Sequence, residues 1–324
     1  MLRRAGVVAA RAAWKRSGCG AVAPASIMSH MRWSSTKKPV VQVLHHNPPQ
    51  TYAQVEQDIA AMQREIRDAY NAGNFNDALE VGLTCRDVVK SHFGEQHPVY
   101  ASTITNIALM YKNLGRMEEA VESYEFALQV YKESVGEMHA SFATTLHNLG
   151  SVYRTLSLSA AGMERVNALH RAMECFEESL KIRKSILEPG HPDIALTMSN
   201  LGVIYWHNKK AEKAFQVLTE AKDMLERKVG PSSTLTALAM NNLAYINKEA
   251  RKYDEAVALY EEVVAVRERV LGAEHNETIM AQHNLAEAYR ASGQEEKAVA
   301  IQQQILDLFD AEAVDESESS KKNQ

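Results

Sequence analysis

From about residue 55 to about residue 310, apolar residues recur at the three- and four-residue intervals of amphipathic helices. Turn signals interrupt this pattern at regular distances. Gly115 and Gly293 mark one set of turns, and Gly136, Gly230 and Gly272 mark a second set. The pattern therefore predicts a series of helix pairs and disfavours an all-β fold.

The helix pairs form a sequence repeat. Five four-residue strings begin with Asn, as in Asn-Leu-Gly-Val at Asn200, and successive strings are separated by 42, 52, 42 and 42 residues. Small residues recur two positions after each Asn, and Ala recurs fourteen positions after it once a ten-residue insertion is allowed for. Small residues let neighbouring helices approach closely. We expect the insertion, at 156–166, to lengthen the turn inside the third repeat.

Columns such as Leu149-Gly150, Tyr153 and Ala172 resemble the tetratricopeptide repeat (TPR) family, and the 42-residue period is similar to its kinesin light chain subtype. The resemblance implies an all-α fold, a superhelical solenoid of about six helix-turn-helix repeats. The repeats are predicted near residues 55–96, 97–138, 139–190 (with the insertion), 191–232, 233–274 and 275–310.

Charge separates the first 38 residues from the rest of the chain. Residues 1–38 contain eight Lys or Arg and no Asp or Glu, so removing them from the 36 bases and 41 acids of the chain leaves a net charge of −13 for residues 39–324. The segment 1–38 is rich in Arg, Ala and Ser and resembles a mitochondrial presequence, with a disordered basic arm as the alternative. We therefore expect a mitochondrial protein, located in the matrix.

Two further segments flank the array. Residues 39–54 contain three prolines and indicate an extended linker, and residues 311–324 indicate a disordered acidic tail. The acidic body disfavours direct nucleic-acid binding, because that affinity comes largely from basic side chains on phosphates. No stretch approaches the roughly 18 apolar residues of a transmembrane helix, so no membrane span is expected.

Two columns of the repeat are candidates for partner binding. The TPR resemblance implies that the recurring Asn faces a concave groove and holds the backbone of a bound peptide; a bond between neighbouring helices is the alternative. Six residues after each Asn comes a base or Trp, which favours an acidic peptide or acidic helix as the partner, with the indole as an apolar anchor. A solvated face of long side chains is the alternative for this second column. The Asn column is Asn106, Asn148, Asn200, Asn242 and Asn284, and the basic row is Lys112, Arg154, Trp206, Lys248 and Arg290.

Histidine also recurs, at His97, His139, His191 and His275, in equivalent positions where first helices begin. Neighbouring helices lie roughly 8–10 Å apart, too far for a shared ion with ligands at about 2 Å, so these residues are expected at repeat junctions and not in a metal site. No phosphate-binding loop, zinc-protease or serine-hydrolase motif is present in the sequence. We therefore expect no catalytic residues, no metal and no cofactor.

These observations predict a non-catalytic protein–protein interaction scaffold in mitochondria. It would bind a segment of a protein partner in the concave groove and assist the assembly or stability of a large complex. The alternative is a structural subunit of a mitochondrial RNA-processing or translation complex. The sequence does not identify the complex.

Overall fold

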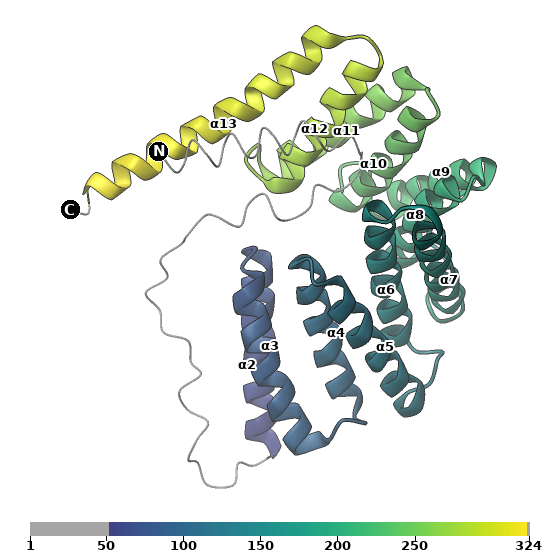
Figure 1. Ribbon diagram of the computed structural model, residues 1–324, viewed down its shortest axis with the longest axis vertical. Helices are drawn as coiled ribbons and strands as arrows, with labels where there is room; N and C mark the ends of the chain where they lie inside the picture. Colours follow the sequence, from purple (N-terminus) through teal and green to yellow (C-terminus); the bar gives the residue numbers. More distant parts are fainter. Residues whose placement is uncertain (1–51, 323–324) are drawn as a thin grey trace. The chain divides into compact units, whose positions relative to one another are not determined.

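The computed structural model describes residues 52–322, and the side chains of residues 52–308. This part of the chain is all helical, with twelve α-helices and no strand (Figure 1). The described residues divide into two compact units, here called the N-terminal unit (52–186) and the C-terminal unit (187–322). The predicted presequence and most of the predicted linker lie outside the described residues.

The N-terminal unit contains three helix pairs, and each helix packs against the next one in the chain. One continuous core, which includes Cys85, Tyr124 and Phe142, runs through the unit. The pairs, which are repeats 1 to 3, are α2 (Tyr52–Asn71) with α3 (Phe75–Phe93), α4 (Pro98–Asn113) with α5 (Met117–Ser134), and α6 (Ala140–Ser159) with α7 (Gly162–Ile186).

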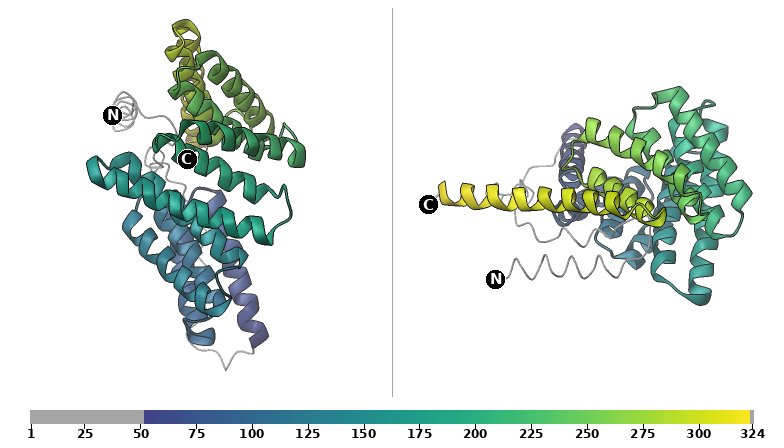
Figure 2. Two further views of the ribbon diagram at one scale, coloured as in Figure 1. Left: turned by 90° about the vertical axis from the view of Figure 1, so that its right-hand side faces the viewer. Right: turned by 90° about the horizontal axis from the view of Figure 1, so that it is seen from above.

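The C-terminal unit repeats this arrangement in three further pairs (Figure 2). Its first helices also contact one another directly, α8 with α10 and α10 with α12. The pairs, which are repeats 4 to 6, are α8 (Pro192–His207) with α9 (Ala211–Val229), α10 (Thr234–Glu249) with α11 (Tyr253–Leu271), and α12 (Asn276–Ala291) with α13 (Glu295–Lys322).

The small-residue column marks the closest approach of the two helices of a repeat. A Cβ atom added to Gly202 on α8 would lie 2.5 Å from Cγ of Leu218 on α9. A Cβ atom on Gly150 would lie 3.2 Å from the side chains of Cys175 and Phe176. Packing therefore excludes a side chain at Gly202, because Leu218 fills the space that a Cβ atom would need, whereas a Cβ atom at Gly150 would require a small shift of its neighbours.

The recurring histidines begin the first helices. In each of four repeats the imidazole Nδ1 accepts a hydrogen bond from the backbone N–H two residues later, at 3.1–3.2 Å. Ser233 does the same in repeat 5, where its Oγ accepts from Leu235. The column is thus a set of N-caps, which satisfy helix donors that have no partner inside the helix. The capping histidines are His97, His139, His191 and His275.

The turn inside each repeat needs a residue with positive φ. Gly115 ends α4 in this way at φ 79°, and the backbone N–H groups of Gly115 and Arg116 then bond back to carbonyls of the last helical turn. Lys209 and Arg251 take the same position in repeats 4 and 5, at φ 59° and 62°. They are the non-glycine residues with positive φ in the described part of the chain.

The ten-residue insertion does not form a long turn, so that prediction was wrong. α6 continues to Ser159 and α7 begins at Gly162, so both helices of repeat 3 are longer than their counterparts. The inserted residues include neither Pro nor a helix-breaking run, and Leu156 packs against the core of the N-terminal unit. Helix extension therefore absorbs the extra residues.

Most of the predicted acidic tail lies in α13. α13 extends to Lys322, so residues 311–322 continue the last helix. This segment contains no Gly or Pro to end a helix and is rich in Ala, Glu and Lys, which favour helix propagation.

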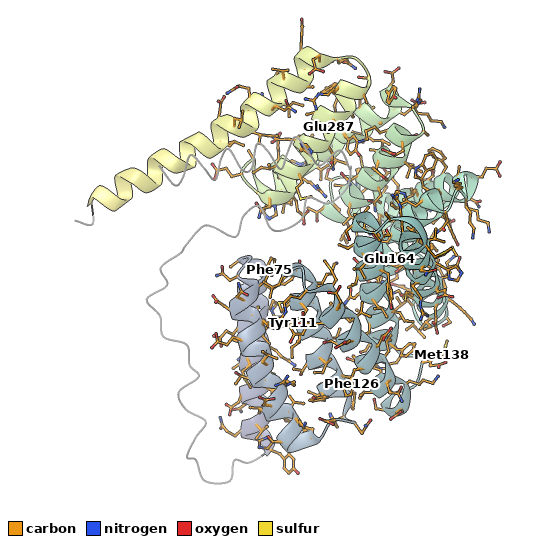
Figure 3. The ribbon with its side chains drawn as sticks, in the orientation of Figure 1. Phe75, Tyr111, Phe126, Met138, Glu164 and Glu287 are labelled. Atoms are coloured by element: carbon orange, nitrogen blue, oxygen red, sulfur yellow. The ribbon has the colours of Figure 1, made fainter. Side chains whose placement is uncertain are left out.

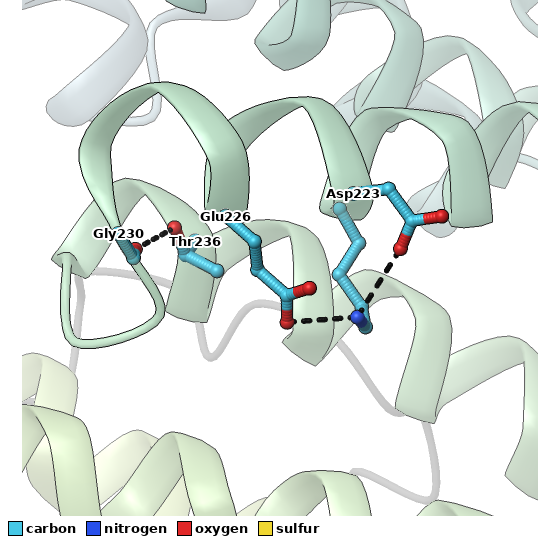
Figure 4. A network of polar contacts seen from close by, with 5 residues as sticks. Asp223, Glu226, Gly230 and Thr236 are labelled. Atoms are coloured by element: carbon cyan, nitrogen blue, oxygen red, sulfur yellow. Dashed lines mark hydrogen bonds and ion pairs between the residues drawn. The ribbon is translucent and has the colours of Figure 1, made fainter.

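Side chains close the junction between α9 and α10 (Figure 4). The hydroxyl of Thr236 donates to the carbonyl of Gly230 at 2.7 Å. On α9 the ammonium of Lys222 lies between Asp223 and Glu226, at 3.3 and 2.7 Å. The bond from Thr236 therefore attaches the loop between α9 and α10 to α10.

Candidate functional site

The predicted basic row lies near the carboxyl ends of the first helices, where all five side chains are half-buried. Lys112, Lys248 and Arg290 occupy the last turns of α4, α10 and α12. Cations at this end of a helix interact favourably with its dipole. Part of the periodicity of the row therefore has a local explanation in helix stability.

In the N-terminal unit the row forms a cationic cluster. The Lys112 ammonium on α4 donates to Oγ of Ser151 on α6 at 2.8 Å, and it forms no ion pair with a described carboxylate. Burial, and then the nearby Arg154 guanidinium, lower the pKa of Lys112 to about 8. Two successive first helices thus bring positive charge together without an internal acid at Lys112.

His147 on α6 belongs to the same cluster. Burial, and then the positive charges of Arg183, Lys112 and Arg154, together lower the pKa of this imidazole to about 3. The ring packs edge-on against Phe176, with 5.2 Å between ring centroids. His147 is therefore neutral at physiological pH, and the cluster keeps its positive charge on the lysine and the arginines.

In the C-terminal unit the residues of the basic row have different contacts. The Arg290 guanidinium is paired with Glu287, labelled in Figure 3, and lies 3.4 Å from Glu295. Lys248 forms no ion pair with a described residue, and the indole of Trp206 packs edge-on against Phe215 with centroids 5.9 Å apart. Arg290 is thus engaged within its own repeat, whereas Lys248 has no carboxylate partner among the described residues.

The Asn column has two kinds of environment. Asn242 donates to Oγ of Ser199 at 3.0 Å, and Asn284 donates to Oδ1 of Asn241 at 3.1 Å. Both bonds join the first helices of neighbouring repeats, which is the alternative role considered for this column. Asn106 and Asn148 are half-buried and form no hydrogen bond with another described residue. Their amides can still engage a peptide backbone.

The described residues contain no group of three or more His, Cys, Asp or Glu side chains that could hold a metal. Cys85 and Cys175 are buried, and burial raises the pKa of both thiols, to about 12 for Cys175. Such thiols are poor nucleophiles. None of the described helices is long and apolar enough to cross a membrane.

The sequence interpretation did not include three residues that the structure places in or near the candidate sites. Ser151 and Arg183 join the cationic cluster through contacts that span about one repeat, which no local pattern reveals. Arg251 has a signal in the sequence, because it stands where repeats 1, 2 and 6 have Gly.

A family model described as tetratricopeptide repeat matches residues 100–161, 166–227 and 235–311, which is more than half of the chain. The chain belongs to the tetratricopeptide repeat family. Tetratricopeptide repeats generally form non-catalytic scaffolds that bind other proteins, and the match indicates no enzyme family. A comparison with curated proteins gives no match.

Solved structures show the same TPR fold at low sequence identity. The nearly identical TPR-like repeats of a Podosopora anserina protein, described as a kinesin light chain, are 24% identical, with a TM-score of 0.51 over 65% of this chain and 95% of that one. BtubC (BKLC) from P. vanneervenii is 20% identical, with a TM-score of 0.54 over 82% of this chain and 93% of that one. At these identities the likeness describes the fold of the TPR protein and not its partner.

Proposed function

We propose that this TPR protein is a mitochondrial scaffold that binds an acidic segment of a protein partner on its first helices, and so assists the assembly or stability of a large complex. The observation that favours an acidic partner is the environment of Lys112. Its ammonium is half-buried, donates to the hydroxyl of Ser151, has no ion pair with a described carboxylate and lies beside Arg154.

A carboxylate supplied by a partner would complete this site. It would accept charge-assisted hydrogen bonds from Lys112 and offset the repulsion between Lys112 and Arg154. Asn106 and Asn148 flank the cluster on the same two helices and can bond to the partner's backbone. Lys248 would add a second acid contact in the C-terminal unit.

Affinity purification of the tagged chain from isolated mitochondria, followed by mass spectrometry, identifies the partner. The Arg154→Glu/Lys248→Glu variant should then bind that partner at least about tenfold more weakly in isothermal titration, or about 1.4 kcal/mol, because attraction becomes repulsion. Binding should also weaken as salt concentration rises.

The matched control is Lys184→Glu/Arg227→Glu, which makes the same charge change at exposed positions on second helices. It should bind as the wild type does. Equal affinity of the row variant and the wild type would contradict the acidic-partner proposal. Retention of the purified protein on RNA at physiological salt would instead favour a role in RNA processing or translation.

The mitochondrial location has its own test. Amino-terminal sequencing of the endogenous protein should find a mature chain that has lost roughly the first 33 residues. An intact Met1 on the mature protein, or recovery in the cytosolic fraction, would contradict the location.

A further inference from the structure

Two hollows in the C-terminal unit occupy the same place in successive repeats. One, of about 430 Å³, is lined by Trp206, His207, Lys209 and Ala211 at the turn of repeat 4. The other, of about 370 Å³, lies at the turn of repeat 5. Its lining includes the residues 42 positions later, Lys248, Glu249, Arg251 and Tyr253, together with Glu287 and Arg290 of repeat 6. The two hollows are therefore equivalent sites in successive repeats, lined by different side chains.

Each hollow contains one of the non-glycine residues with positive φ. Lys209 and Arg251 occupy a turn position where Gly73, Gly115 and Gly293 stand in repeats 1, 2 and 6. A Cβ atom makes this conformation unfavourable, so glycine would be the more stable choice. Both exceptions are basic and both side chains are exposed. Strained residues of this kind persist where their side chains serve a function.

Contacts with Phe215 link residues of the two turns. Trp206 lies edge-on to Phe215 of α9, and the ammonium of Lys252 lies 4.5 Å from the centroid of the same Phe215 ring. The first hollow therefore presents an indole and one cation. The second presents three bases and two acids, of which Glu287 is already paired with Arg290. An apolar side chain suits the first hollow, and a carboxylate suits the second.

The repeat spacing fixes how far apart these two side chains must lie. Packed helices are about 8–10 Å apart, and an extended chain in the polyproline II conformation advances about 3.1 Å per residue and presents every third side chain on the same face. We propose that the turns of repeats 4 and 5 bind an extended peptide in which an apolar side chain lies three residues from an acidic one. This inference rests on the proposed function and specifies the segment that the partner presents.

Peptide arrays test the spacing directly. Dodecamers of Gly and Ser that carry one Leu and one Glu, separated by one to six residues, are probed with the full chain. Binding should be strongest at a separation of three and should fall when Glu is replaced by Lys. A response that does not depend on the separation would overturn the proposal.

The best peptide is then titrated against the Trp14→Phe/Trp33→Phe chain, in which Trp206 is the only indole and reports binding by its fluorescence. The further substitutions Lys209→Gly/Arg251→Gly should raise the melting temperature and weaken peptide binding at least about tenfold. Arg227→Gln, at an exposed base that lines neither hollow, should leave peptide binding unchanged. Unchanged binding by the double glycine variant would overturn the proposal.

The two proposals fail in different ways. If the purified partner depends on Arg154 and Lys248 but the glycine variant binds it normally, the scaffold function stands and the turn site is wrong. If no protein partner is recovered, the scaffold function fails, whatever the peptides do.

Discussion

The hydroxyl of Tyr153 on α6 donates a hydrogen bond to Oε1 of Glu125 on α5, at 3.1 Å. The same bond joins Tyr289 on α12 to Glu261 on α11, again 28 residues earlier. A tyrosine of one repeat is thus tied to the second helix of the preceding repeat. The tyrosine column of the sequence therefore does more than fill space between helices.

Tyr153→Phe should lower the free energy of unfolding by about 1 kcal/mol, because it removes this bond and leaves the packing of the ring intact. The measurement is urea denaturation followed by circular dichroism. Tyr111→Phe is the matched control in the same column, since the Tyr111 hydroxyl has no hydrogen bond to a described residue. An equal loss in both variants would contradict an energetic role for the Tyr–Glu bond.

The capping histidines give a second prediction. His139→Ala should cost about 1 kcal/mol, because the N–H of Ser141 loses its acceptor. His139→Ser should retain most of the stability, since Ser233 caps the equivalent helix of repeat 5. Chemical denaturation of the three proteins distinguishes the cases. A serine variant as unstable as the alanine variant would show that the imidazole contributes by packing.

The lowered pKa of His147 predicts acid sensitivity. The folded state resists protonation down to about pH 3, whereas the unfolded chain protonates near its ordinary value of about 6.5. The unfolded state therefore binds more protons between these values, and stability should fall as pH drops through this window. Through His147, the free energy of unfolding should fall by up to about 2 kcal/mol as the pH is lowered from 6.5 to 5.

His147→Gln removes this titration, so its stability should depend less on pH than that of the wild type between pH 6.5 and 5. The comparison at each pH isolates the effect of His147 from the effects of all groups that the two proteins share. Parallel stability curves for the two proteins would rule out this origin of acid sensitivity.

Tyr124 gives a prediction of the opposite sign. Its side chain is fully buried, and its hydroxyl has no hydrogen-bond partner among the described residues. Tyr124→Phe should raise the free energy of unfolding by about 1 kcal/mol, since an unsatisfied buried hydroxyl is costly. Phe176 already occupies this column in repeat 3. Tyr153→Phe is the control, because it removes a hydroxyl that donates a hydrogen bond to Glu125 and should therefore lower the free energy of unfolding.

The helix pairs could be predicted from the sequence because the residues buried between helices recur at regular intervals along the chain. Gly202 belongs to the column of small residues because Leu218 leaves no room for a Cβ atom at this position. Similar close contacts between helices limit the residue type at the equivalent position of each repeat. The insertion was placed correctly in the sequence but given the wrong structure. Whether ten extra residues form a loop or lengthen two helices depends on what Leu156 packs against, which the repeat register does not encode.

The candidate site was less predictable than the fold. The bond from Lys112 to Ser151 joins residues on different repeats, so no local pattern reports it. The pairing of Arg290 with Glu287 has a visible signal, because the two lie three residues apart on one helix. Counting bases in a column overlooks such pairs, and the basic row therefore overstated the positive charge available to a partner.

Within the C-terminal unit the Tyr–Glu bond is missing between repeats 4 and 5, where repeat 5 has Asn247 in the tyrosine column and repeat 4 has Thr219 in the glutamate column. The next junction keeps its tie and adds a bond from the Arg267 guanidinium to the carbonyl of Glu277. The joint between repeats 4 and 5 is instead crossed by the bond from Asn242 to Ser199 and by the contact of the Tyr245 hydroxyl with His207. Because this joint lies between the two hollows, any bending there would change the spacing of the two side chains that a bound peptide must present.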